Sequence, residues 1–253
     1  MPKPGQSDQR ERRPGSSITA PSATILLIAA ARSEIDATIR RLGLAWHGDQ
    51  ATGSINDSEI IAALTGIGAR RAVDRVNALL DAHPVERVIH LGFAGGLDPA
   101  LRPGDVLRIG CVCNEQGETQ TLDGDPAARL LTADHLATTV AGKRTLHEAT
   151  GAAAVDMETY PLAKMLHERG VSLIALRAIS DTADTPLPRT ALQWLDPHGN
   201  ARPLRVAGWL LAHPGECAAL WRLARHVRRA ADRLAMEVER LVASGPSLRS
   251  GPA

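Results

Sequence analysis

Short apolar runs alternate with helical stretches along the first two thirds of the chain. A buried strand is predicted at residues 24–28, and apolar residues at helical spacing follow it over residues 32–42. The same order recurs where a strand at 59–64 precedes a helix that begins after Gly68. This alternation is typical of an α/β fold, in which helices cover a central sheet.

The alternation continues through the middle of the chain and then changes character. A helix predicted over residues 158–169 ends at Gly170. After residue 190, arginine-rich helical segments end in a long amphipathic stretch over about 216–242. We therefore expect a catalytic domain over residues 23–190 and a C-terminal helical extension over residues 191–243 that packs on it. Further strands are predicted at 87–91, 106–113, 152–155 and 173–179.

Both ends of the chain are rich in small and polar residues and have no apolar periodicity. Residues 1–22 are expected to be a disordered tail and residues 244–253 a frayed terminus. No apolar segment in the first twenty residues suits a signal peptide. The longest apolar run, residues 23–31, is far shorter than the ~20 residues of a membrane helix. These features predict a cytoplasmic protein.

Charge and composition narrow the classes of ligand. The 29 Lys and Arg nearly balance the 28 Asp and Glu, so no net charge favours nucleic acid as a partner. Aromatic residues make up 2% of the chain, so the core must be built from aliphatic side chains. The cysteines Cys111, Cys113 and Cys217 are too few for a disulfide framework and lack zinc-site spacing. We expect a small ligand, with no metal and no organic cofactor.

Three acidic residues follow predicted strands, at the edge of an α/β sheet where ligands bind. They are Glu34, Glu158 and Asp181. Cleavage of the bond between a base and ribose needs an acid for the base, a hold on the sugar hydroxyls and a nucleophile. Carboxylates can fill all three roles. Acids are also common in the first turn of helices, so capping stays open as the structural alternative for Glu34 and Glu158.

Four motifs, in this order between residues 24 and 185, resemble those of purine nucleoside phosphorylases and nucleosidases. They are Thr65-Gly66-Ile67-Gly68, Gly92–Leu97 with Pro103-Gly104-Asp105, Val155-Asp156-Met157-Glu158, and Arg177–Asp184. The resemblance implies a three-layer phosphorylase/hydrolase-like sandwich with a central mixed sheet. The sequence is most similar to hopanoid-associated phosphorylases, also described as adenosylhopane nucleosidases, whose tails resemble the segment 195–199.

The resemblance assigns a role to each matched residue of the nucleoside site. Asp181 would protonate the purine at N7, for which burial must raise its pKa. Ser180 would help to hold that carboxyl group. Glu158 would bind the 2′ and 3′ hydroxyls of the ribose, and Met157 would pack against the sugar. Arg177 is expected to brace neighbouring carboxylates or a subunit contact rather than to touch substrate.

The resemblance also implies a pocket for the nucleophile. Glu34 occupies the place of the carboxylate that activates water, and the backbone N–H groups around Gly66 and Gly68 would suit phosphate or that water. Two positions depart from the pattern of methylthioadenosine nucleosidases. Leu136 stands where a Phe against the base is expected, and Phe93 stands where a small residue, often Ser, is usual. Water and inorganic phosphate both stay open as the second substrate.

These residues lead to one main hypothesis and two alternatives. The main hypothesis is cleavage of the adenine N-glycosidic bond of adenosylhopane, giving adenine and a ribosyl or phosphoribosyl hopane in hopanoid biosynthesis. The alternatives are a 5′-methylthioadenosine or S-adenosylhomocysteine nucleosidase and a non-catalytic nucleoside- or lipid-binding module. The C-terminal region is typical of a packed helix with a solvated face, and would also suit peripheral contact with the inner membrane surface. By analogy with related enzymes we expect a homo-oligomer.

Overall fold

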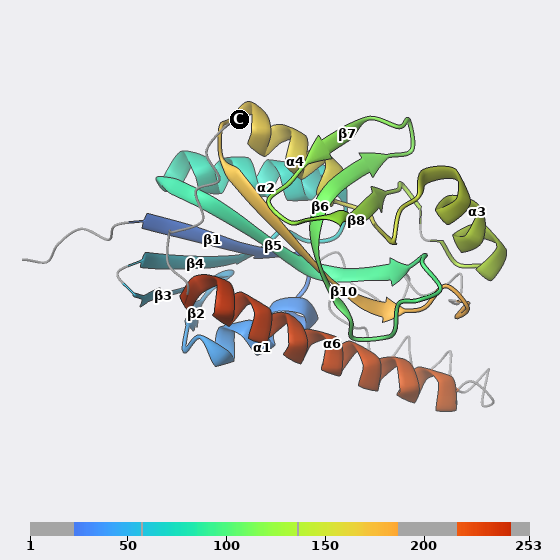
Figure 1. Ribbon diagram of the computed structural model, residues 1–253. Helices are drawn as coiled ribbons and strands as arrows, with labels where there is room; N and C mark the ends of the chain where they lie inside the picture. The colour runs from blue at the N-terminus through green and yellow to red at the C-terminus, as the bar shows by residue number, and fades with distance from the viewer. Residues whose placement is uncertain (1–22, 57, 136, 187–216, 244–253) are drawn as a thin grey trace, which may run out of the picture.

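A 10-stranded sheet runs through the protein, with helices on both of its faces (Figure 1). The computed structural model describes residues 23–56, 58–135, 137–186 and 217–243, with only the backbone described over 217–223. The predicted tails at 1–22 and 244–253, and the extension between 191 and 216, lie outside the described residues. The predicted three-layer α/β sandwich with a central mixed sheet is confirmed.

Four parallel strands form the central part of the sheet. The strand β1 (Ala23–Ala29) pairs in parallel with β4 (Ser58–Leu64) and β5 (Val85–Gly96), and β5 pairs in parallel with β10 (Ser172–Asp181). These strands are rich in apolar residues because helices cover both of their faces. Since they are parallel, their carboxyl ends lie at one edge of the sheet.

Shorter strands complete the sheet and close part of it into a ring. Because β10 pairs with both β5 and β6, the strands β10, β6, β8, β9 and β5 follow one another around a closed circuit. This ring brings the ends of β5, β9 and β10 together. The remaining strands are β2 (Ala45–His47), β3 (Gln50–Ile55), β6 (Val106–Asn114), β7 (Thr119–Thr121), β8 (Asp125–Thr132) and β9 (Ala154–Asp156).

Two apolar clusters lie on the two faces of the sheet, and alternate residues of β1 enter each. Leu26 and Ile28 join the cluster under the helices α2 and α4, whereas Leu27 joins the cluster under α1 and α6. Full burial of one such aliphatic side chain contributes roughly 1.5–3 kcal/mol. The helices are α1 (Arg32–Arg41), α2 (Ala69–Ala82), α3 (Val140–Thr150), α4 (Thr159–Glu168) and α6 (Cys217–Ala243).

The helix α6 confirms the long C-terminal helix that the sequence predicts. Its residues Ala230, Leu234 and Val238 are fully buried in the same cluster as Ile35 and Ile39 of α1. Figure 1 shows α6 running alongside α1 on one face of the sheet. The helix is therefore part of the core of the described structure and not an appendage on its surface.

The glycine segment at 92–96 differs from the expected strand-ending turn. It forms the last third of β5, and Gly95 and Gly96 pair with β9 while Gly95 also pairs with Asp181 of β10. A Cβ atom on Gly96 would lie 3.1 Å from the backbone oxygen of Asp181. The glycines thus permit two strands to approach β5 closely where the ring closes.

Candidate active site

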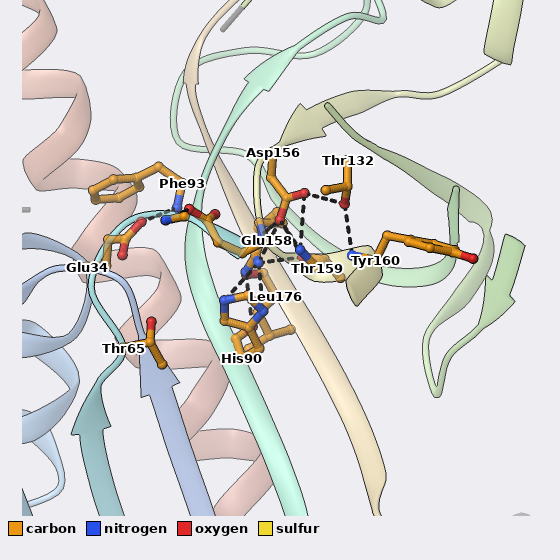
Figure 2. Close-up of polar contacts among 12 residues, drawn as sticks. Glu34, Thr65, His90, Phe93, Thr132, Asp156, Glu158, Thr159, Tyr160 and Leu176 are labelled. Atoms are coloured by element: carbon orange, nitrogen blue, oxygen red, sulfur yellow. Dashed lines mark hydrogen bonds and ion pairs between the residues drawn. The ribbon is translucent and has the colours of Figure 1, made fainter. Parts of the chain in front are cut away.

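The carboxyl edge of the sheet brings together the three acids that the sequence places after strands. Glu34 lies in the first turn of α1, Glu158 between β9 and α4, and Asp181 at the end of β10. Figure 2 shows Glu34, Phe93, Glu158 and Asp156 converging above the strand ends. Strand direction explains the positions of Glu34 and Asp181, which follow or end the parallel strands β1 and β10, whereas Glu158 follows β9, which is antiparallel to β5.

Glu34 bridges its own helix and the glycine segment of β5. Its Oε2 accepts the backbone N–H of Ala31 at 3.0 Å, which is the local contact of a capping carboxylate. Its Oε1 accepts the N–H of Phe93 at 2.9 Å. Burial raises the pKa of Glu34, while the Phe93 N–H and the charge of Arg177 oppose that rise. Capping is thus one function of this side chain but not the only one.

A buried ion pair lies directly beneath the acids. The Nε and Nη2 atoms of Arg177 donate to Oδ2 of Asp156 at 3.1 and 2.9 Å, and both side chains are almost fully buried. Arg177 also donates to the Thr159 hydroxyl at 2.6 Å, and the hydroxyl of Thr132 donates to Asp156 Oδ1 at 2.7 Å (Figure 2). The expected bracing of a carboxylate by Arg177 is present.

His90 belongs to the same network as a core residue. Its side chain is 2% exposed and lies against Arg177, whose Nη1 donates to the His90 backbone oxygen at 3.2 Å. Burial, and then the charge of Arg177, lower the pKa of His90 well below its usual value. His90 is therefore a buried core residue beneath the site with a neutral imidazole.

Glu158 does not cap the helix that it precedes. It is the N-cap residue of α4 without any side-chain capping bond, and its Oε1 instead accepts the backbone N–H of Gly68 at 2.9 Å. Gly68 has φ 105°, a left-handed conformation that favours glycine, and is the N-cap of α2. Burial, and then the charge of Asp156, raise the pKa of Glu158 to about 7. The structural alternative of a simple cap is therefore wrong for Glu158.

Asp181 is held by two side chains. The Ser180 hydroxyl donates to Asp181 Oδ1 at 2.6 Å, which is the contact expected of Ser180. The Nζ of Lys143, on α3, forms an ion pair with Oδ2, and both side chains are buried. The sequence analysis missed Lys143. A compositional signal was present, because Lys3, Lys143 and Lys164 are the only lysines in a chain with 29 basic residues.

The structure gives a different outcome for each of the remaining predicted site residues. Gly66 has φ 75°, so its left-handed conformation explains the glycine. Met157 is half-buried between Asp156 and Glu158 in the chain. The Phe93 ring packs against the apolar cluster under α6, so its backbone N–H, and not its ring, faces Glu34. Leu136 lies outside the described residues. The catalytic and binding roles of all these residues remain predictions.

Candidate metal ligands are not grouped in the described part of the chain. No cluster of three or more His, Cys, Asp or Glu with metal-binding placement occurs among the described residues, and Cys111 and Cys113 are free thiols. The acids of the site contact backbone N–H groups, a guanidinium and an ammonium. The site as described is thus built from carboxylates and their hydrogen-bond donors.

Comparison with known proteins agrees with this architecture. A family model described as the phosphorylase superfamily matches residues 45–138 and 130–211. Helicobacter pylori 5′-methylthioadenosine/S-adenosylhomocysteine nucleosidase is 19% identical, with a TM-score of 0.66 over 88% of this chain and 98% of that chain. Futalosine hydrolase of the same organism is 18% identical, with a TM-score of 0.66 over 88% and 98%.

A third solved structure extends the comparison to another organism. Campylobacter jejuni 5′-methylthioadenosine/S-adenosylhomocysteine nucleosidase is 16% identical, with a TM-score of 0.65 over 88% of this chain and 99% of that chain. Identities this low establish a shared fold. The aligned regions cover nearly the whole length of each of these enzymes.

Proposed function

This chain belongs to the phosphorylase superfamily and is therefore an enzyme that acts on N-glycosidic bonds, and we propose that it releases adenine from a 5′-substituted adenosine with water as the second substrate. The proposal assigns the acid role to Asp181 and the base role to Glu34. Glu158 binds the ribose hydroxyls. The choice of water over phosphate depends on the charge of the pocket.

The observation that carries this choice is the occupancy of two backbone donors. The N–H groups of Phe93 and Gly68, which would have to bind a phosphate, already donate to the carboxylates of Glu34 and Glu158. A phosphate dianion would have to displace both contacts and then lie among ionisable carboxyl groups, where like charges repel. A neutral water can donate to Glu34 without that penalty. The pocket geometry therefore favours hydrolysis.

The reaction follows from these assignments. Glu34 accepts a proton from water, whose oxygen bonds to C1′ as the C1′–N9 bond breaks. The electron pair of that bond stays on adenine, which takes a proton at N7 from Asp181. Glu34 ends protonated and Asp181 ionised, and exchange with solvent restores both. The raised pKa of Glu34 makes it a stronger base than an exposed glutamate.

Adenosylhopane is the proposed substrate, and the support for it is the sequence similarity of the chain to hopanoid-associated phosphorylases. The segment that carries much of this similarity, 195–199, lies outside the described residues. A 5′-methylthioadenosine or S-adenosylhomocysteine nucleosidase is the second candidate, because two of the similar solved structures carry that activity in their names.

A peripheral contact with an anionic membrane surface is part of the adenosylhopane proposal. No helix among the described residues is long and apolar enough to cross a membrane. The solvent face of α6 exposes Arg225, Arg228, Arg229 and Arg233 on the side opposite its buried alanine and leucine residues. Basic side chains on an amphipathic helix suit the headgroups of anionic lipids. We also propose a homo-oligomer, by analogy with related enzymes.

Adenine release from three substrates tests the function. Adenosylhopane in detergent, 5′-methylthioadenosine and S-adenosylhomocysteine are each supplied with and without inorganic phosphate. Phosphate-independent release from adenosylhopane is the expected result. Release from the thioadenosines alone would establish the second candidate, and a strict need for phosphate would overturn the choice of water. No release from any of them would favour a binding module.

A further inference from the structure

We propose that Lys143 is a positioning residue for the acid of this site, which fixes the carboxyl group of Asp181 and stabilises the carboxylate that remains after its proton has passed to the leaving base. The proposal rests on the proposed function, because it assumes that Asp181 is the acid. It adds a residue on a helix that the sequence pattern did not predict.

The ammonium group of Lys143 is fully enclosed by acceptors. The side chain has 0% exposure, and it is the buried residue of α3. Its Nζ forms the ion pair with Asp181 Oδ2 and donates to the backbone oxygens of Thr182 at 2.7 Å and Thr185 at 2.9 Å. The three protons of an ammonium group thus have three acceptors, one of which is charged.

Burial of an ammonium group costs too much free energy for this arrangement to be a by-product of packing. An ammonium group removed from water is strongly destabilising unless it is paired and hydrogen-bonded. A helix that needed only an apolar contact at this position would be better served by Leu or Met. The lysine instead extends from the second turn of α3 to the end of β10, where the proposed acid lies. The ion pair with Asp181 therefore explains why a charged residue occupies this position.

No other charged side chain has a described contact with Asp181. Ser180 donates to Oδ1 from within β10, and the β5 residue beside the carboxylate is Gly95, which carries no charge. The other ionisable groups of the site form a separate set around Arg177: Glu34, Asp156, Glu158 and His90. Removal of Lys143 thus removes the cation that contacts the acid.

The chemistry of base departure gives this cation a role. Asp181 is neutral when it holds the proton and becomes a carboxylate as N7 takes the proton and the C1′–N9 electron pair stays on adenine. A cation within contact distance stabilises the negative charge that develops on this carboxyl group as the proton leaves. Because the same ammonium binds the backbone of Thr182 and Thr185, it also fixes the chain that follows the acid.

Neutral and charged substitutions separate this role from a structural one. The neutral variants are Lys143→Met, which preserves chain length, and Lys143→Gln, which keeps an N–H donor for Asp181 if the Met variant does not fold. Lys143→Arg keeps the charge. Lys164→Met, on the exposed face of α4, is the matched control. For each variant, kcat and KM for adenine release are measured from pH 5 to 10, with thermal unfolding as the check of folding.

In the neutral variants we expect kcat on the plateau to fall about tenfold or more, with KM within about threefold of the parent. The alkaline limb of the kcat profile should move to higher pH, because the neutral variants lack the cation that contacts the carboxylate of Asp181. Lys143→Arg should recover most of kcat and keep the limb of the parent. The Lys164 variant should match the parent throughout.

Three results would overturn the proposal. A lower kcat with an unmoved limb in the folded neutral variants would show that Lys143 serves the fold alone. A limb that moves to lower pH would show that the lysine supplies the proton itself. A parent enzyme that releases no adenine from any of the three substrates would overturn the proposed function together with this role, whereas an active parent with unaltered variants would overturn this role alone.

Discussion

Replacement of Glu158 by Gln should stabilise the ligand-free protein at alkaline pH while it abolishes tight binding of the ribose. The carboxyl group is largely buried beside Asp156, and its pKa is raised from 4.5 to about 7. The folded protein therefore retains a proton between these two values that the unfolded chain releases. Stability is highest below the unfolded value, falls as pH rises from 4.5 towards 7, and is lowest above 7.

The expected gain in the free energy of unfolding follows from the rise in the pKa of Glu158. A rise of about 2.5 pH units would correspond to roughly 3 kcal/mol at 1.36 kcal/mol per unit, and coupling to Asp156 and partial exposure make roughly 1–3 kcal/mol the expected range. The amide oxygen of Gln can still accept the Gly68 N–H, so this contact survives the substitution. Nearly all of the gain should therefore be electrostatic.

Urea unfolding of the parent and of Glu158→Gln at pH 5 and pH 8 measures this gain. At pH 5 only the first part of the fall in stability has occurred, so the two free energies of unfolding should differ by less than about 1 kcal/mol. At pH 8 the variant should be the more stable protein. Glu168→Gln, at the exposed end of the same helix, controls for loss of a glutamate. Equal differences at both pH values, or a variant less stable at pH 8, would refute the reasoning.

Three further predictions concern other parts of the site and surface. Glu34→Gln should lower kcat/KM about 100-fold or more, and a variant as fast as the parent would exclude Glu34 as the base. In the parent, the acid limb of the activity profile should lie above pH 4.5, the usual pKa of Glu, because the base must be ionised and burial raises the pKa of Glu34. Arg177→Met should lower the free energy of unfolding by about 3–5 kcal/mol, since it leaves the carboxylate of Asp156 buried without its cation, and urea unfolding would reveal a smaller value if water replaces the guanidinium. The double variant with Arg228→Glu and Arg229→Glu should no longer float with phosphatidylglycerol vesicles, but its turnover of 5′-methylthioadenosine should match that of the parent. The control Arg70→Glu, on α2, should float like the parent. A parent protein that does not float would refute the proposed membrane contact.

The strands that the sequence predicts well are those with helices on both faces. The strands β1, β4 and β10 are continuous apolar runs, because each alternate side chain enters one of the two clusters. The strands β2 and β3 lie at the end of the sheet, where polar and small residues are tolerated, so no apolar run marks them. Apolar periodicity detects burial on two faces better than it detects hydrogen-bonded pairing.

Helix α3 shows a different limit of sequence analysis. Periodicity searches for an apolar stripe, and the buried residue of α3 is Lys143. Its start is marked only by Thr139, whose side chain accepts the N–H of Gly142 at 3.0 Å. A helix whose buried residue is a cation, paired with a carboxylate on a strand distant in sequence, is not marked by any local sequence pattern. Its charge becomes interpretable only when β10 places Asp181 against it.

The site was predictable to the level of which acids share an edge, and not to the level of what they contact. The direction of the parallel strands places Glu34 and Asp181 at one edge, and Glu158 arrives there from β9, which is antiparallel to β5. The attachment of Glu158 to Gly68 depends on how α4 and α2 pack, and the sequence favoured a sugar clamp for Glu158 while a cap stayed open as the alternative. The Phe93 position was predicted to alter the pocket, yet the structure turns the ring into the core and retains only the N–H.

The charges around Arg177 connect the choice of nucleophile with the chemistry of the sugar. Among the described residues, this one guanidinium acts on the three carboxyl groups of Glu34, Asp156 and Glu158, and it is directly paired with Asp156. Burial raises the pKa values of Glu34 and Glu158, and a pocket with more carboxyl groups than cations opposes a phosphate dianion. The same excess attracts positive charge, which develops on the ribose as the base departs. A pocket that rejects phosphate would thus also be suited to stabilise an oxocarbenium-like sugar, so the proposed hydrolysis and the proposed sugar activation would follow from a single feature of the site.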